Sequence, residues 1–170
     1  MKIYKNIFLF CFILSLNIQS YEGVRNEIIF SKKPPLKLSE YGFFKNMNSQ
    51  LPSKGVLPYT LESQLFSDYA DKLRFIYIPE NKFAKNVPDR VFDFPDGTAL
   101  IKTFAYLNQH SSSNLPSQLL ETRLLIKKNG EWSNISYIWN KDQDEAFLSI
   151  AGKTITTKFI NSNGELKDVR

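Results

Sequence analysis

The chain has 170 residues, with 22 Lys or Arg, 17 Asp or Glu, and a formal charge of +5 at pH 7. This length suits one ordinary domain and excludes a large multidomain assembly. Acidic and basic residues alternate along the chain instead of gathering in one basic stretch, so we expect no nucleic-acid partner.

The N-terminus has the layout of a secretory signal peptide. Two lysines precede an apolar run at residues 7–16, and Ser20 supplies a small residue where cleavage is expected. The run is shorter than the roughly 20 residues of a bilayer span, so we expect no stable membrane span after removal of residues 1–20. Removal would also take away the only cysteine, Cys11, which excludes a disulfide. The pattern therefore predicts a periplasmic or extracellular protein.

The N-terminal part of the mature chain is expected to contain little regular structure. Residues 21–38 include two consecutive prolines and read as an extended segment, followed by a single β-rich domain at 39–170. Ser39 is expected to cap a helix of one turn, because Gly42 follows closely. A second short helix is expected from Leu61 to Tyr69, where apolar residues recur at helical spacing.

From Lys72 onward the pattern changes to strand-like alternation. Strands are expected at 72–78, 90–94 and 98–107, and on both sides of Asn129 and Gly130, of Gly152 and of the turn at 161–164. Residues 108–118 are expected to form one long loop. About six to eight strands with one or two short N-terminal helices predict a mainly β fold, an antiparallel sandwich or a partly open barrel.

Metal chemistry has few candidate ligands. His110 is the only histidine and lies in the serine-rich loop, so no zinc or copper site is expected. Asp142, Asp144 and Glu145 could offer oxygens to calcium, but the stretch lacks the glycine and the distal glutamate of a calcium-binding loop. A solvated turn is the favoured interpretation, and no metal site is predicted.

The sequence predicts one candidate site, a polar pocket with an aromatic wall that would suit a sugar or another small polar ligand. Its catalytic residues, if any, are unknown. The eight candidate residues are Asp68, Arg74, Lys102, Arg123, Trp139, Asn140, Asp142 and Gln143. The stretch at 58–80, which contains Asp68 and Arg74, is interpreted first as a core-forming corner, with Asp68 paired to Arg74 or Arg123, and only second as a site.

Several motifs occur in a fixed order between about residues 36 and 151: "PYTLESQLFSDYADKLRF", "FPDGT", "KTF", "ETRLL", "YIWN" and "DQDEA". In this combination the chain resembles a family of exported bacterial proteins of unknown function that occur with, or as, c-type cytochromes. "FPDGT" followed by "IKTF" is also similar to the cytochrome P460 type of β domain. In the first family this region precedes a Cys-x-x-Cys-His haem-attachment segment, which is absent from this sequence.

The resemblance implies a cytochrome partner but no cofactor in this chain, because haem c would belong to a downstream segment or to another protein. Two arrangements stay open: the front part of a longer haem-containing protein, or a β domain that stands alone. Three functions follow as hypotheses. They are a binding or docking module alongside a c-type cytochrome, a secreted hydrolase or oxidoreductase acting on a small polar or sugar-like substrate, and a ligand-free structural envelope protein.

Overall fold

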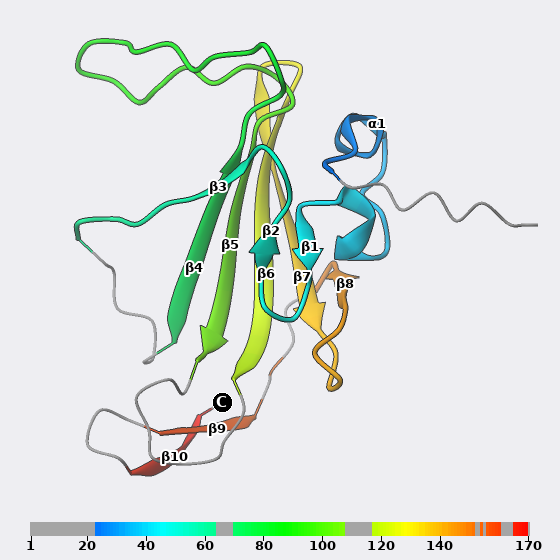
Figure 1. Ribbon diagram of the computed structural model, residues 1–170, viewed down its shortest axis with the longest axis vertical. Coiled ribbons are helices and arrows are strands. Elements are labelled where there is room, and N and C mark those ends of the chain that lie inside the picture. Colours follow the sequence, from blue (N-terminus) through cyan, green and yellow to red (C-terminus); the bar gives the residue numbers. More distant parts are fainter. Residues whose placement is uncertain are drawn as a thin grey trace, which may run out of the picture.

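The computed structural model describes residues 23–63, 70–107, 117–151, 154, 156–160 and 165–169. The fold is mainly β, as predicted, and its main sheet is open instead of closed into a barrel. This sheet is an antiparallel meander of six strands (Figure 1). In spatial order the strands are β3 (Val56–Pro58), β4 (Asp71–Tyr77), β5 (Ala99–Tyr106), β6 (Gln118–Lys128), β7 (Glu131–Trp139) and β8 (Ala146–Ser149).

The remaining elements are short. Helix α1 (Asn26–Ile29) and the 3-10 helix η1 (Leu38–Tyr41) precede a small antiparallel pair, β1 (Phe44–Asn46) and β2 (Leu51–Pro52). Strands β9 (Thr157–Ile160) and β10 (Leu166–Val169) form a second antiparallel pair. The hairpin expected around Gly152 is wrong, because β8 pairs with β7 whereas β9 pairs with β10. The pairing of β9 with β10 agrees with a turn at 161–164, although those residues lie outside the described ones.

The strands of the main sheet bury alternate side chains. In β5, Ala99, Ile101 and Thr103 are fully buried, whereas Leu100 and Lys102 between them are partly exposed. Successive side chains of a strand point to opposite faces, so the sheet has one covered face and one open face. The covered face carries the core.

The N-terminal segment covers this face. Tyr41 stacks on Phe43 with ring centroids 5.0 Å apart, and Phe44 meets Phe75 of β4 edge-on at 5.1 Å. The prediction of a wholly extended segment at 21–38 is wrong, because Asn26–Ile29 form the helix α1. Ile29 at the end of this helix is fully buried. The helix forms although the sequence signal is weak, because burying Ile29 against the sheet stabilises so short a helix.

Helix η1 confirms the predicted single turn, which ends at Gly42 with φ of +71°. Its cap differs from the prediction. Lys37 occupies the N-cap position, and the backbone N–H of Lys37 donates to the Glu40 carboxylate at 2.9 Å. The Ser39 hydroxyl instead donates to Glu145, which lies in the loop before β8. The contact of Ser39 with the distant Glu145 therefore takes the place of the helix-capping role predicted for Ser39.

A buried polar network ties β1 and β2 to the sheet. The Thr103 hydroxyl donates to Gln50 Oε1 at 2.7 Å and lies 2.7 Å from the Thr122 hydroxyl. Trp139 Nε1 donates to Thr122 Oγ1 at 3.0 Å. The side-chain amide of Gln50 also donates a hydrogen bond from Nε2 to the Met47 carbonyl at 2.7 Å. Because these polar side chains have partners, their burial carries no large desolvation penalty.

The hairpin between β6 and β7 is confirmed. Asn129 and Gly130 have φ of +51° and +80°, and Lys128 pairs with Glu131 across the turn.

The strand expected at 90–94 is wrong, since only Asp93 pairs there, in an isolated bridge with Lys85. The start of the helix expected at Leu61–Tyr69 is also wrong, because residues 61–63 are not helical. Residues 64–69, and 108–116 of the expected loop, lie outside the described ones.

Candidate functional site

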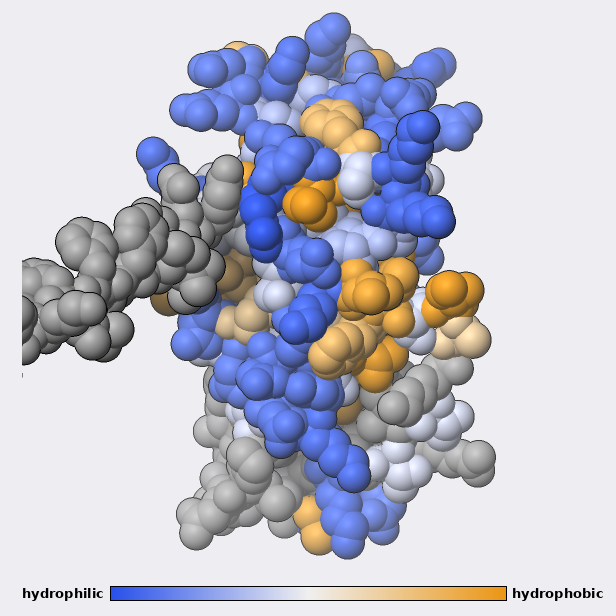
Figure 2. Space-filling view, turned by 90° about the vertical axis from the view of Figure 1, so that its right-hand side faces the viewer, coloured by the Kyte–Doolittle hydropathy of each residue, from blue (hydrophilic) through white to orange (hydrophobic). Residues whose placement is uncertain are grey.

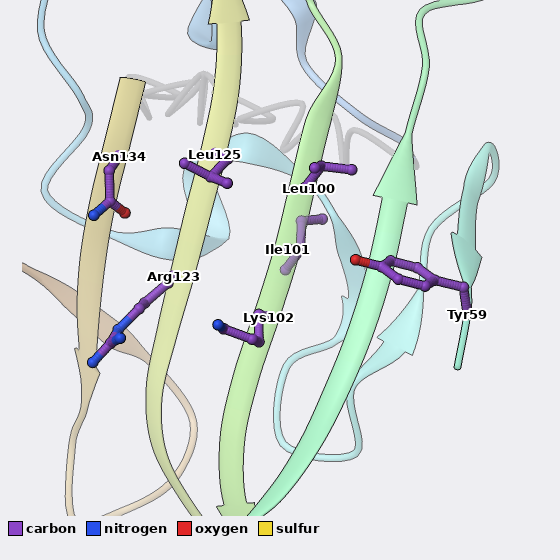
Figure 3. A pocket seen from close by; sticks show the side chains of 7 residues that line it. All are labelled: Tyr59, Leu100, Ile101, Lys102, Arg123, Leu125 and Asn134. Atoms are coloured by element: carbon purple, nitrogen blue, oxygen red, sulfur yellow. The ribbon is translucent and has the colours of Figure 1, made fainter. Parts of the chain in front are cut away.

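Three of the predicted site residues lie side by side on the open face of the sheet. Arg74 of β4 pairs in register with Lys102 of β5, which pairs with Arg123 of β6. Cross-strand partners point to the same face, with Cβ atoms roughly 5 Å apart. We call Arg74, Lys102 and Arg123 the cation row. Figure 3 shows Lys102 and Arg123 projecting from neighbouring strands on the same side of the sheet.

The cation row has little negative charge around it. Arg123 Nη2 contacts Glu121 Oε2 at 2.8 Å, and this carboxylate lies on the same strand. Arg74 is only 8% exposed, and its Nη1 donates to the Lys72 carbonyl at 3.1 Å. Within the described part of the chain, no carboxylate lies within ion-pair distance of Arg74 or Lys102. Two of the three cations therefore have no described acidic partner.

The aromatic ring of Phe104 lies next to the cation row and contacts two of its members. Lys102 Nζ lies 5.0 Å from the centroid of this ring, and the Arg123 guanidinium carbon lies 4.9 Å from it. Such cation–π contacts are worth about 0.5–1 kcal/mol when exposed. They hold both cationic groups over one ring and thereby fix where the positive charge gathers.

The pKa of Lys102 reflects this crowding. Burial lowers the pKa of the Lys102 ammonium below its ordinary value of 10.5, and the charge of Arg123 lowers it further. Arg74 and then Lys72 act in the same direction. At Arg123 the hydrogen bond to Glu121 raises the pKa of the guanidinium. The environment of Lys102 thus disfavours its charged form.

Apolar side chains adjoin the cation row and form a groove with it. The groove has a volume of about 260 Å³, and Figure 3 shows its lining side chains between Tyr59 at one side and Asn134 and Arg123 at the other. Its lining residues are Tyr59, Leu100, Ile101, Lys102, Arg123, Leu125 and Asn134. Leu125 is 40% exposed and Tyr59 is 36% exposed, so apolar surface remains available beside the charges. This arrangement can hold an acidic group next to an apolar one.

The other predicted site residues do not join the groove. Trp139 belongs to the covered face through its bond to Thr122. The Gln143 side chain, with a φ of +60°, donates to the Asn140 carbonyl at 2.8 Å and accepts from the Leu119 N–H at 2.5 Å. The aromatic wall expected from Trp139 is therefore absent, and Asn140 and Gln143 build a turn instead of a pocket.

The acidic stretch behaves as the predicted turn. Asp142 is exposed, and Asn140 Nδ2 donates to Asp144 at 2.7 Å. Glu145 Oε1 accepts from the Ser39 N–H at 3.2 Å. No group of three metal-binding side chains occurs among the residues that the structure describes. Asp68, the eighth candidate residue, and His110 lie outside this part of the chain.

Sequence reasoning missed the apolar side of the groove. Leu100 and Leu125 line the groove, and Phe104 contacts Lys102 and Arg123 beside it. All three alternate with core residues, and each was interpreted as part of a strand and not as part of a site. Their positions in the sequence could have placed them with Lys102 and Arg123, because residues two apart in a strand share a face. The register between strands was needed to align the three cations.

A second apolar surface lies at the β8 edge of the sheet. Figure 2 shows apolar residues gathered within an otherwise hydrophilic flank, on the side of the molecule where β8 and the N-terminal segment lie. Leu36, Phe147 and Ile150 are exposed there by 73%, 44% and 98%. The strand edge itself is occupied, since the Leu148 N–H donates to the Leu36 carbonyl at 2.9 Å. This surface is therefore no free template for another strand.

Comparisons with family models, with curated proteins and with solved structures give no significant match. The helices of the described residues are too short to cross a membrane.

Proposed function

We propose that this chain is a binding module that acts alongside a c-type cytochrome, and that the open face of the sheet is its binding surface. The observation that carries the proposal is the cation row. Arg74, Lys102 and Arg123 stand in direct cross-strand register on a face that the N-terminal segment leaves uncovered. Like charges directly opposite each other destabilise a sheet, so this row opposes folding and calls for a role in binding.

The role of the open face contrasts with that of the polar groups elsewhere. Gln50, Thr103 and Thr122 satisfy one another inside the core, and Glu145 is held by Ser39. In the cation row, Arg74 is buried, Lys102 is partly buried, and these two have no acidic partner among the described residues, whereas Arg123 is exposed and contacts Glu121. An anionic partner would relieve the repulsion, and any ligand that binds only the native state stabilises it.

The cytochrome is the part of the proposal that rests on the motif resemblance. Its test is co-purification of the exported chain from bacteria that mature c-type cytochromes, followed by a denaturing gel stained for haem. Covalent haem survives denaturation, so a stained band of another size identifies a c-type cytochrome. We expect wild type and Lys141→Met to retain this band and Lys102→Met to lose it at moderate salt.

Two outcomes would overturn parts of this proposal. A Lys102→Met chain that retains the haem protein as well as wild type would exclude the open face as the contact surface. A wild-type chain that retains no haem protein would exclude the cytochrome.

The same gel tests the expectation that this chain itself carries no covalent haem. Intact-mass measurement of exported material tests the removal of residues 1–20.

A further inference from the structure

We infer that the open face binds a small amphiphilic carboxylate, with its acidic head on the cation row and its apolar part on Leu100 and Leu125. This inference rests on the proposal that the open face is a binding surface, and it assigns to the same face a small ligand that would compete with the cytochrome for Lys102. The relevant observations are the charge of the row, the apolar residues next to it, and the size of the groove.

The charge calls for an anion. Lys72, Arg74, Lys102 and Arg123 bring four positive charges to this part of the face, and Glu121 brings one negative charge, which leaves +3. Lys102 stands at the centre of the cation row, with an arginine on each neighbouring strand. A carboxylate has two oxygens and could accept from Lys102 and Arg123 together. Hydrogen bonds between charged groups are about twice as strong as neutral ones.

The side chains two positions away from the cation row on β4, β5 and β6 are apolar. Ile76 pairs with Leu100, and Leu100 pairs with Leu125. Tyr59 closes one side of the groove, as Figure 3 shows. A ligand that covered these side chains would gain about 25 cal/mol for each Å² of apolar surface removed from water. The groove therefore offers a charged end and an apolar end in fixed order.

Other occupants fit less well. The groove of about 260 Å³ falls near the lower limit of sites for drug-sized molecules, which favours a small ligand. A nucleic acid would need a longer track of cations than one row of three. A second copy of the chain, docked face to face, would bring cation rows close together and add to the repulsion.

The experiment measures thermal unfolding and binding heat with three probes below their micellar concentrations: decanoate, a neutral decyl glycoside, and acetate. Decanoate at ten times its Kd should raise Tm by about 3–6 °C, because native-state binding stabilises a domain of this size by that amount. The glycoside and acetate should each bind at least about tenfold more weakly than decanoate.

Variants assign the binding to the cation row. Lys102→Met should weaken decanoate binding about tenfold or more, Lys102→Arg should retain most of it, and the exposed Lys141→Met should match wild type. The arginine variant separates loss of the positive charge from a change in the shape of the side chain.

Three results would overturn the inference. Equal binding of acetate would indicate a bare anion site, and equal binding of the glycoside would indicate an apolar site. Both would leave the open face as the binding surface. Absence of binding by every probe would also exclude the amphiphile. The proposed function is decided separately, by whether wild type retains the haem protein and Lys102→Met loses it in the co-purification.

Discussion

The two faces of the six-stranded sheet use the same strands in opposite ways. On the covered face, Thr103 and Thr122 are fully buried and hydrogen-bonded to each other and to residues around them. One residue away on the same two strands, Lys102 and Arg123 repel each other on the open face. The comparison teaches that this fold concentrates its stability on one face and leaves unbalanced charge on the other, where binding can use it.

The largest effect should come from the matched pair Leu124 and Leu125, which point to opposite faces. Leu124 is fully buried and Leu125 is 40% exposed. Leu124→Ala should cost about 2–5 kcal/mol of unfolding free energy, because it leaves a cavity in the core. Leu125→Ala should cost less than about 1 kcal/mol. Urea unfolding measures both, and similar costs would mean that the two faces are equally buried.

The next effect concerns the polar network of the covered face. Thr103→Val removes the hydroxyl that donates to Gln50, which is 4% exposed, and should cost about 1–3 kcal/mol. Combining it with Gln50→Met removes both partners, so the double variant should cost less than the sum of the single ones. Additive costs in this double-mutant cycle would show that the two side chains do not depend on each other.

A smaller effect should come from the turn that sets which residues of β6 and β7 share a face. Gly130→Val should cost about 1–2 kcal/mol, because a β-branched residue resists the positive φ at this position. A Cβ there would meet nothing within 4 Å, so the cost comes from the backbone alone. Gly130→Asn should cost less, since asparagine tolerates this conformation. Equal melting temperatures for the glycine and valine chains would argue against this turn.

The smallest effect should come from the open face itself. Lys102→Met should raise the unfolding free energy by up to about 1 kcal/mol at neutral pH, because the burial of the charge and the like-charge repulsion that it removes outweigh the lost cation–π contact with Phe104. The pKa of Lys102 is lower in the folded chain than its ordinary value of 10.5, so the penalty is present below the folded pKa. The penalty is lost as pH rises from the folded pKa toward 10.5, where the unfolded chain also loses the proton, so the gain should shrink as pH approaches about 10. A methionine variant less stable than wild type at pH 7 would contradict the repulsion.

Local patterns in the sequence were sufficient to predict the mainly β class, the strands β4 to β7 and the turn at Asn129 and Gly130. Alternation of apolar residues and the positive φ of a tight turn are properties of short segments, so they can be read without knowing the rest of the fold. They also placed Lys102 and Arg123 among the candidate site residues.

Tertiary structure decided what lies together. The cation row exists because the pairing of β4, β5 and β6 aligns Arg74, Lys102 and Arg123, and such register depends on contacts between segments far apart in the chain. The same long-range packing formed α1 over the sheet, drew Ser39 to Glu145, and placed Trp139 on the covered face. The sequence by itself therefore determined the strands β4 to β7 and the turn between β6 and β7, whereas packing between distant segments decided α1 and the site, because a strand's own pattern does not specify its neighbour.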